Sequence, residues 1–475
     1  MVLSTSLVVF TTSCRMEHIY SKYEVEIEQK SITKKEQFVL LQSYKSRCKK
    51  VLAAALTIIV GILCCCKLSN MLFELLRAVG NERIQLKIII PLGISYYTFS
   101  CIGYLLDIYW RKIRPEKNYF KFLLCMIYFP QIVQGPISRY NKLLPQFEKP
   151  KTLTYQRLCQ GLQLMLWGYF KKMVIADRLS IFITDVFSDI TKNGGLVILC
   201  AVIFSVFQLY TDFSGCMDIV TGASDILGVQ LDKNFDHPFF SKSVAEFWRR
   251  WHITLGAWFK DYIYFPIATS PKTMSLTKKV KQRWGVQAGK AISTVIPLSA
   301  VWILTGIWHG TGWHYILWGC YFGTLIIFST IFAEQYKKLS MQIMLNVNEQ
   351  VLNNLRILRT FCLFMIGRLL TAPGSLENSI KAVIRICTSF NLWTLWDYSF
   401  YSHGLDRRNF IVAIISIMVL MFVERLQTKI KIREALSRKN IVFRWSIYYL
   451  GLFAVIILGI YGPGYDASSF VYANF

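Results

Sequence analysis

The feature that most limits the fold of this chain is a succession of apolar runs separated by short basic segments. Such runs recur through most of the 475 residues, whereas a single soluble core stops growing at roughly 250–300 residues. Several runs are shorter than the ~20 residues that a perpendicular membrane helix needs. Short runs interrupted by Gly or Pro are typical of tilted or re-entrant helices that pack against protein. The runs lie at approximately 51–66, 88–109, 119–134, 159–176, 195–210, 293–308, 314–333, 355–370, 409–423 and 444–461.

The composition indicates the same class. Hydrophobic residues make up 54% of the chain and charged residues only 17%, against about 25% charged in an average soluble domain. The net charge is +26, and the basic residues fall mostly between apolar runs, as on cytoplasmic loops beside anionic headgroups. A nucleic-acid binder carries its basic charge on a soluble surface or arm. We therefore expect a lipid bilayer and no nucleic acid as partner.

The chain divides into a polar, basic segment at 1–50 and a membrane domain at 51–475. Met1–Phe10 is too short to span a bilayer and lacks a basic start, so no cleavable signal peptide is expected. The 13 cysteines include no C-x-x-C pair and no Cys/His spacing suited to zinc. The sequence therefore predicts neither a metal site nor a disulfide framework.

Basic segments also predict the orientation of the second half. Ser241–Lys290 holds ten Lys/Arg and two acidic residues, and the segment after Val423 is similarly basic, so both are assigned to the cytoplasm. Four runs lie between them, as two cytoplasmic ends require. This assignment places the loop 334–354 inside, and the turn Trp308–Trp313, the loop 371–408 and the C-terminus outside.

His309 is the strongest candidate for chemistry. It ends an apolar run, between Trp308 and Gly310. An ionisable group at membrane depth is costly and usually faces a cavity or a partner, and imidazole suits proton transfer near neutral pH. The adjacent glycines would let a substrate or another backbone approach closely. The alternative is a histidine that caps a helix end at the interface.

His252 is the second candidate. It lies among aromatic residues at 247, 251, 258 and 262 with interleaved basic residues, a pattern typical of one amphipathic helix at the membrane interface. The alternative is that His252 is one more interfacial polar ring. The predicted topology puts His252 on the cytoplasmic side and His309 at the outer turn. A polar passage that joined them would then cross the membrane.

Two further groups of polar residues lie in apolar surroundings. Asp212 and Ser214 fall in apolar surroundings, and for Asp212 an ion pair with Arg178 or another basic residue is favoured over catalysis. Gln131 and Gln134 lie between two helix-breaking prolines. Irregular backbone at this depth is expected to line a cavity.

These motifs together resemble the membrane-bound O-acyltransferase family, in its bacterial branch of alginate-acetylation, peptidoglycan-acetylation and teichoic-acid D-alanylation proteins. The likeness runs in order from about residue 88 to the end. The residues that carry it are Pro130–Pro136, Lys172–Arg178, Tyr210–Gly215, Asn234–Phe239, Phe247–Pro266, Trp308–Gly310 and Phe470–Phe475.

The resemblance implies an all-α, multi-pass membrane fold of about ten membrane helices, with interfacial and re-entrant helices around a central passage. It implies that His309 is the catalytic base and that His252 is the second signature histidine, which assists or holds the donor. The donor is expected to be acetyl-CoA or another acyl thioester, and no bound cofactor is expected. The expected substrate-binding residues are Trp248, Arg249, Arg250, Trp308, Gln131, Gln134, Asp212 and Ser214, with the arginines suited to phosphate.

The implied reaction moves an acyl group, expected to be acetyl, from a cytoplasmic thioester to a hydroxyl of an extracellular polysaccharide or cell-wall polymer. It implies a bacterial inner-membrane location and a separate extracytoplasmic acyltransferase partner. One departure is that residues 11–50 are polar where the family has two long apolar helices, as a late-starting gene model or a shortened protein would show. The alternatives are a polytopic glycan or lipid transporter and an inactive family remnant.

Overall fold

The computed structural model describes residues 1–29, 33–78, 93–132, 134–149, 151–310, 312–336 and 348–461, with 67–78 described by backbone alone. Every regular element in these ranges is a helix. Some sequence features lie outside the described residues. They are the first residues of the run 88–109, Thr311, most of the loop 334–354, and Phe470–Phe475.

The described chain forms two compact units. The first comprises Met1–Leu153 and Leu227–Asp232, and the second comprises Thr154–Ile226 and Lys233–Phe475. The predicted domain boundary at residue 50 falls inside a helix of the first unit and stays a prediction. The helices of the first unit are α1 (Val2–Gln29), α2 (Lys34–Ala78), α3 (Ile94–Tyr109), α4 (Tyr119–Met126), α5 (Phe129–Ile132) and α6 (Tyr140–Glu148).

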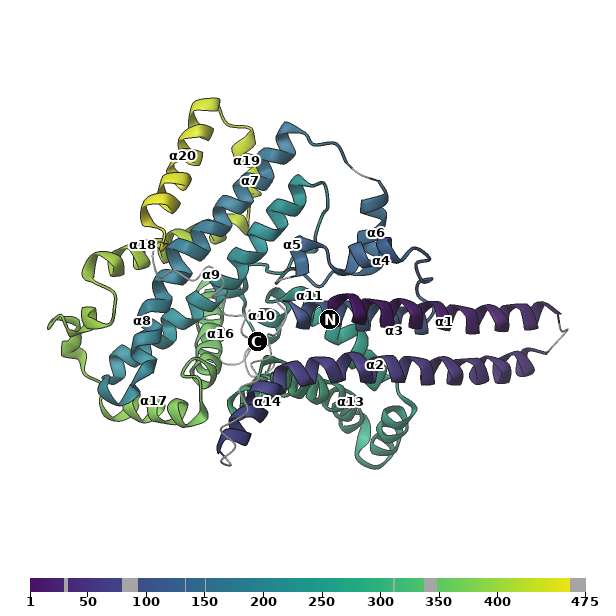
Figure 1. Ribbon diagram of the computed structural model, residues 1–475. Helices are drawn as coiled ribbons and strands as arrows, with labels where there is room; N and C mark the ends of the chain where they lie inside the picture. Colours follow the sequence, from purple (N-terminus) through teal and green to yellow (C-terminus); the bar gives the residue numbers. More distant parts are fainter. Residues whose placement is uncertain are drawn as a thin grey trace. The chain divides into compact units, whose positions relative to one another are not determined.

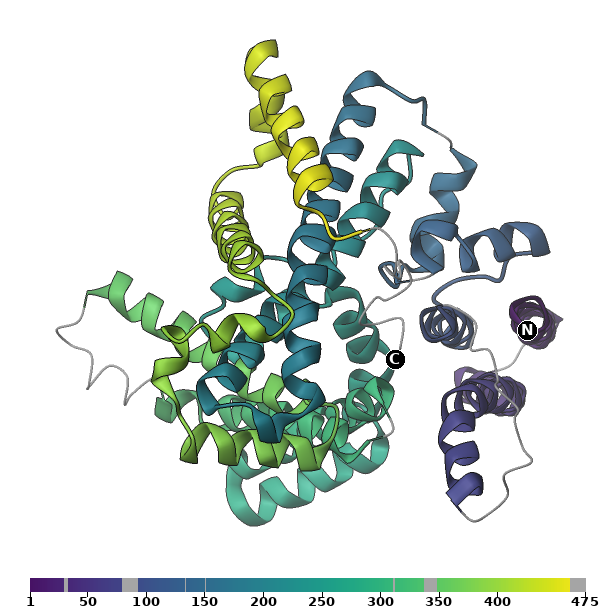
Figure 2. The ribbon, with the colours of Figure 1, turned by 60° about the vertical axis from the view of Figure 1, so that its left-hand side comes forward.

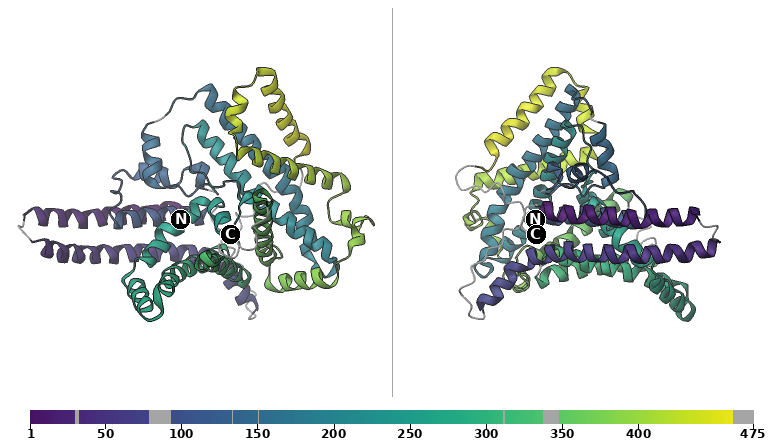
Figure 3. Two further views of the ribbon diagram at one scale, coloured as in Figure 1. Left: turned by 180° about the vertical axis from the view of Figure 1, so that it is seen from behind. Right: turned by 45° about the vertical axis from the view of Figure 1, so that its right-hand side comes forward.

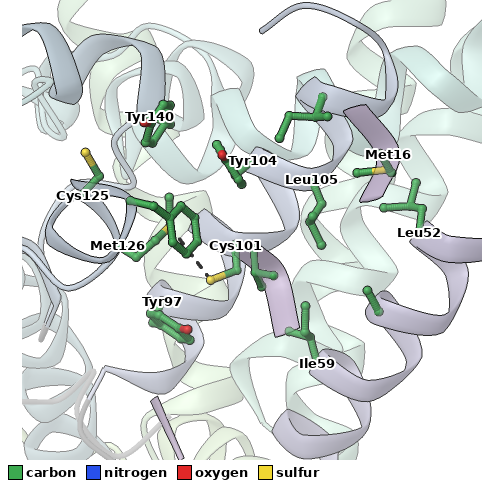
Figure 4. Packing of buried hydrophobic residues seen from close by; sticks show 14 of the residues in the cluster. Met16, Leu52, Ile59, Tyr97, Cys101, Tyr104, Leu105, Cys125, Met126 and Tyr140 are labelled. Atoms are coloured by element: carbon green, nitrogen blue, oxygen red, sulfur yellow. Dashed lines mark hydrogen bonds between the residues drawn. The ribbon is translucent and has the colours of Figure 1, made fainter. Parts of the chain in front are cut away.

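The polar N-terminal segment is helical because it carries a narrow apolar stripe. Val9, Met16 and Tyr20 recur at helical spacing on α1 and are fully buried. α1 and α2 lie side by side (Figures 1 and 3). Figure 4 shows Met16 beside Leu52 of α2, in a core that also holds Leu105 and other residues of α3. The stripe is hidden in the average polarity of residues 11–50.

The second unit contains the remaining helices. Their bounds are α7 (Tyr155–Tyr169), η1 (Phe170–Ala176, a π-helix), α8 (Asp177–Ser188), η2 (Ile190–Lys192), α9 (Gly195–Ile226), η3 (Pro238–Phe240), α10 (Val244–Arg250), α11 (Ile253–Phe259), η4 (Lys260–Tyr264), α12 (Phe265–Ala268), α13 (Pro271–His309), α14 (Trp313–Ile331), α16 (Glu349–Thr371), α17 (Leu376–Thr388), η5 (Leu392–Leu395), η6 (Ser399–Ser402), α18 (Arg407–Gln427), α19 (Ile432–Ser437) and α20 (Ile441–Leu458).

Glycine pairs hold the central helices α7 and α9 together. A Cβ on Gly168 would lie 2.6 Å from the carbonyl oxygen of Gly215, and one on Gly222 would lie 2.6 Å from that of Gly161. The two backbones therefore touch directly, as is common between membrane helices with small residues at the interface. Figure 2 shows α7 and α9 side by side, with α20 beside α7.

Six helices of the described chain are long and apolar enough to cross a membrane. They are the 34–66 part of α2, α9, α13, α14, α18 and α20. The predicted run 119–134 instead breaks into α4 and α5, as expected of a Pro-interrupted piece, and the run 355–370 lies within α16, which carries three arginines. The described part of this membrane protein is thus all-helical and contains six candidate spans, where the sequence predicted about ten.

Candidate active site

A tight helical hairpin positions His309. His309 is the last residue of α13, and α14 begins four residues later. A Cβ on Gly306 would lie 2.7 Å from the carbonyl oxygen of Tyr315, and one on Gly319 would lie 2.5 Å from that of Trp302. The two backbones therefore pack against each other along the hairpin, and this contact fixes the turn that carries His309.

His309 is enclosed by aromatic rings. His309 is only 7% exposed. The imidazole centroid lies 4.7 Å from the Trp308 ring and 4.8 Å from the Trp318 ring, and the Tyr315 ring is parallel to it at 6.5 Å. A Cβ on Gly310 would lie 2.3 Å from the Tyr315 ring. Position 310 therefore requires glycine, because any larger residue would collide with the Tyr315 ring.

The segment around His252 is not one interfacial helix, so that prediction is wrong. It forms two short helices, α10 and α11, separated by extended Trp251 and by His252, which has φ 45° and ψ 52°. This left-handed conformation costs about 1–3 kcal/mol in a non-glycine residue. The aromatic residues at 247, 251, 258 and 262 are all buried in protein. A pattern of aromatic and basic residues occurs both in helices at a membrane surface and in helices buried against other helices. The pattern alone therefore does not distinguish the two.

Asn234 holds the His252 ring. Nδ1 of His252 lies 3.1 Å from Oδ1 of Asn234, which also accepts hydrogen bonds from the backbone N–H and the hydroxyl of Thr254. His252 is 4% exposed and Asn234 is 3% exposed. Burial lowers the pKa of His252 well below its usual value, and the nearby His309 lowers it further. The imidazole is therefore neutral at physiological pH.

The two histidines belong to one buried centre. The His252 ring lies 6.2 Å from the Trp308 ring, which in turn contacts His309, and His309 acts electrostatically on His252. The prediction that they lie at opposite ends of a passage is therefore wrong. Counting charges along loops assigns a whole segment to one side. It cannot detect that the two short helices α10 and α11 are packed among other helices.

Trp248 belongs to the same aromatic cluster. Its ring contacts Trp302 at 5.1 Å, Trp318 at 5.5 Å and Phe322 at 4.9 Å. Trp318 also contacts His309. Among the described residues the buried indole N–H of Trp248 has no hydrogen-bond partner. Trp308 thus lies beside both histidines, and Trp248 is one ring removed from His309 through Trp318. The substrate-binding role of both tryptophans stays a prediction.

The two neighbouring arginines differ. Arg249 is exposed, whereas Arg250 forms a 2.6 Å ion pair with Glu246 and donates to the carbonyl of His237. Of the two predicted phosphate-binding side chains, Arg249 is the one that points to solvent. Arg250 instead ties α10 to the segment that precedes it.

Asp212 lies in a buried ion pair, as predicted, but Arg178 is not its partner. The Lys172 ammonium lies 2.7 Å from Asp212 and 2.8 Å from Asp177. Arg178 instead donates to backbone carbonyls of Val174 and Leu458. The π-helix η1 carries Lys172, and the sequence gives no signal for this change of helical register.

Ser214 takes part in a second buried contact. It accepts a hydrogen bond from the Lys171 ammonium at 3.0 Å, and Lys171 also pairs with Asp218 at 2.7 Å. Asp212 and Ser214 thus hold α9 to η1, so their contacts are structural. Phe213, between them, lies 4.8 Å from the His252 ring. This stretch of α9 therefore packs against the His252 ring through Phe213.

The sequence alone did not identify two residues of this region, Asn234 and Glu424. Asn234 is part of the motif Asn234–Phe239, but no sequence pattern shows that it contacts His252 directly. Glu424 of α18 is buried, bonds the Tyr210 hydroxyl, and lies 3.9 Å from Nδ1 of His237. A carboxylate directly after the apolar run 409–423 was a usable signal. Its partners were not, because they are 187 or more residues away in the chain.

Gln131 and Gln134 lie in the first unit, whereas both histidines lie in the second. Both glutamines are buried, and Gln131 donates to the carbonyl of Cys125. Among the described residues the amide group of Gln134 has no hydrogen-bond partner. Their assignment to a substrate pocket stays a prediction.

Comparison with known proteins shows which family the chain belongs to. The model of the membrane-bound O-acyltransferase family matches residues 111–370, which include both histidines. The chain belongs to the membrane-bound O-acyltransferase family. This match covers more than half of the chain and contains the α10–α11 segment and the α13–α14 hairpin.

Relatives carry three different names. The chain is 30% identical to the probable alginate O-acetylase AlgI of Pseudomonas aeruginosa, over 68% of this chain and 56% of that protein. It is 29% identical to the peptidoglycan O-acetyltransferase of Helicobacter pylori, over 53% and 50%, and to the teichoic acid D-alanyltransferase of Bacillus subtilis, over 52% and 60%. The chain thus spans little more than half the length of these relatives.

Proposed function

We propose that this protein is an O-acyltransferase with His309 as its general base. The observation that carries the proposal is the burial of His309 and His252 on either side of Trp308 in one aromatic centre, inside the segment that matches the family. A general base needs to lie within reach of the hydroxyl proton and have a pKa near the working pH. An enclosed centre also excludes water, which would otherwise hydrolyse the donor.

The proposed step is acyl transfer from a thioester to a hydroxyl. The hydroxyl oxygen attacks the thioester carbonyl carbon while His309 accepts the hydroxyl proton. The new C–O bond forms, the C–S bond breaks, and His309 returns the proton to the departing thiolate. General base catalysis of this kind contributes about 10²- to 10⁴-fold. Neutral His252 keeps a second positive charge away from the imidazolium that forms on His309.

The substrates follow from chemistry and family. The donor is an acyl thioester on the cytoplasmic side, acetyl-CoA or another acyl thioester, and exposed Arg249 offers a guanidinium to its phosphates. We propose acetyl as the acyl group, since relatives named for alginate and peptidoglycan are O-acetylating proteins. The acceptor is a hydroxyl of an extracellular polysaccharide or cell-wall polymer, with a separate extracytoplasmic acyltransferase as partner.

We place the protein in the bacterial inner membrane, with about ten membrane helices, interfacial helices and re-entrant helices around a central passage. The six candidate spans and the broken run at α4 and α5 support that architecture. Both reactants would reach the one buried centre from opposite sides of the membrane.

The proposal is tested by the ester content of envelope polysaccharide. Cells that express the protein with its neighbouring genes are compared with cells that carry an empty vector, and acyl groups are released by mild alkali and identified. We expect acetate to be released from the expressing cells. A change in the amount of exported polymer without new ester would favour a transporter. No ester from a folded, membrane-inserted protein would favour an inactive remnant.

A further inference from the structure

Asn234 presents an oxygen to His252, and the hydrogen-bond pattern settles which amide atom it is. A backbone N–H can only donate, and that of Thr254 lies 3.1 Å from the Asn234 atom in question. The atom must therefore be Oδ1. The Thr254 hydroxyl, 2.9 Å away, donates to the same oxygen. The orientation of the Asn234 amide is fixed by these two donors independently of the histidine.

This orientation also settles the protonation of the imidazole. Nδ1 of His252 lies 3.1 Å from Oδ1, an atom that only accepts, so Nδ1 carries the proton. A neutral imidazole carries one proton, and burial keeps His252 neutral. Nε2, on the opposite edge of the ring, is therefore the nitrogen with the lone pair.

We propose that Asn234 is a positioning residue that locks His252 in the Nδ1–H tautomer, so that Nε2 serves the reaction centre as a hydrogen-bond acceptor. The proposal rests on the acyltransferase function proposed above. An accepting Nε2 can orient a hydroxyl or an N–H donor beside His309. The choice of a neutral amide matters, because a carboxylate at this place would favour a charged His252.

The fold holds Asn234 firmly in this place. Its backbone carbonyl accepts from the N–H of Ile253 at 2.9 Å, and its Nδ2 lies 3.2 Å from the sulfur of Met217 on α9. Two residues on, the N–H of Asp236 donates to the carbonyl of Arg250. The segment is therefore paired with both sides of the break between α10 and α11, where His252 adopts its left-handed conformation.

The test is nitrogen NMR of the full-length protein with labelled histidine, in detergent, without acyl donor. The chain has only 6 histidines, and His252 is assigned by its loss in the His252→Gln variant. We expect the Nδ1–H tautomer in the wild type and mixed tautomers in Asn234→Leu. Asn234→Asp keeps the acceptor, so we expect it to keep the tautomer and to raise the titration midpoint of His252 by about one to three pH units.

Thr254→Val is the matched control, since it removes one donor to Asn234 and leaves the bond to His252; its tautomer is expected to be unchanged. An Nε2–H tautomer in the wild type, or an unchanged midpoint in Asn234→Asp, would overturn the proposal. Asn234→Asp decides the question if Asn234→Leu fails to fold. Because no acyl donor is present, an inactive protein that shows the Nδ1–H tautomer would refute the acyltransferase proposal and not this one.

A separate observation concerns the first half of α13. This helix breaks at Gly285, which has φ 89°, so residues 271–284 form a segment of their own. Leu276, Val280 and Trp284 recur every four residues on one face, and Leu276 and Trp284 are 42% and 65% exposed. No acidic residue occurs between Asp261 and Glu334. At about 100° per residue, Lys279 and Arg283 lie on one side of the apolar face and Lys281 lies on the other. The exposed cations of the segment are Lys272, Lys278, Lys279, Lys281 and Arg283.

We infer that this segment lies in the membrane interface and binds anionic phospholipid headgroups. An apolar face with Trp, flanked by Lys and Arg, is the pattern of helices that lie in the plane of an anionic surface. Within the described residues none of the five cations forms an ion pair with a carboxylate, so their charge is available to an external partner. The charge complementarity thus favours an anionic lipid surface.

The test is native mass spectrometry of the purified protein in mixed phosphatidylcholine and phosphatidylglycerol. We expect the wild type to retain phosphatidylglycerol preferentially. A variant with Lys278, Lys279, Lys281 and Arg283 changed to Gln is expected to lose this preference by at least about fivefold, which is the effect of removing even one cation that contributes ~1 kcal/mol near an anionic surface. The matched control changes four solvent-accessible cations that already pair with carboxylates, Lys192, Lys233, Lys381 and Lys431, to Gln and is expected to keep the preference. An unchanged preference in the first variant, or an equal loss in the control, would overturn the inference.

Discussion

Replacing Gly310 by Ala tests whether the aromatic enclosure fixes His309. The added Cβ would lie 2.3 Å and 2.4 Å from two atoms of the Tyr315 ring. Ordinary contact begins near 3.4 Å, so the ring must retreat by about 1 Å. The Tyr315 ring is stacked on the His309 imidazole, and the imidazole is expected to shift with it. The φ of Gly310 is 170°, which any residue adopts, so the clash is the whole perturbation.

A misplacement of about 1 Å near a reacting centre costs on the order of 100-fold in rate, which corresponds to about 2.7 kcal/mol of transition-state stabilisation. We therefore expect Gly310→Ala to lower kcat/KM for acyl transfer about 100-fold. Overpacking of this kind destabilises by about 1–3 kcal/mol, so the folded fraction must be measured alongside. The assay follows labelled acyl transfer by purified protein in lipid nanodiscs.

Gly256→Ala is the matched control, because a Cβ there meets no atom within 4 Å, and it is expected to keep its activity. The double variant Gly310→Ala/Tyr315→Ala removes the ring that is struck and is expected to recover part of the loss. Wild-type activity in a folded Gly310→Ala protein would refute the idea that the enclosure positions His309.

Two further predictions concern stability. Lys172→Met leaves Asp212 and Asp177 as buried carboxylates without their ammonium, so we expect a loss of about 3–5 kcal/mol and a lower thermal midpoint in detergent. Lys192→Met removes an exposed, solvent-screened pair and is expected to leave the thermal midpoint nearly unchanged; equal effects of the two substitutions would contradict this reasoning. The depressed pKa of His252 means that the unfolded state binds a proton more readily. Its contribution to stability is therefore complete above its ordinary pKa of 6.5 and is lost as the pH falls below that value, by about 1.4 kcal/mol per pH unit. The thermal midpoint of the wild type should drop more between pH 7 and pH 5 than that of His252→Gln, and parallel curves would count against a buried neutral His252.

The sequence was sufficient for the helical membrane class, and it singled out His309, which lies buried among aromatic rings. The apolar runs directly indicate the helical membrane class. A histidine between Trp308 and Gly310 is conspicuous because few ionisable residues lie in these runs. The burial of Asp212 in an ion pair followed from the same reasoning. The identity of its partner did not, because the π-helix turns Lys172 towards α9 where the sequence suggested Arg178.

The position of His252 was the main error, and its cause is physical. Loop charge predicts which side a segment starts from, whereas the depth that it reaches depends on tertiary packing. α10 and α11 are only seven residues each, too short to give a periodic signal, and the left-handed residue between them is a histidine where a glycine would have been recognised. Asn234 was equally hidden, since it gains its role from donors 18–20 residues away.

The most direct test of the account is the acyl-transfer rate of His309→Ala beside that of His403→Ala. His403 is bonded to Asp185 in a separate part of the second unit and controls for the loss of an imidazole. With both proteins folded to the same extent, the account predicts a loss of about 10²- to 10⁴-fold for His309→Ala and a near-wild-type rate for His403→Ala. A His309→Ala protein that transfers acyl groups at the wild-type rate would contradict it.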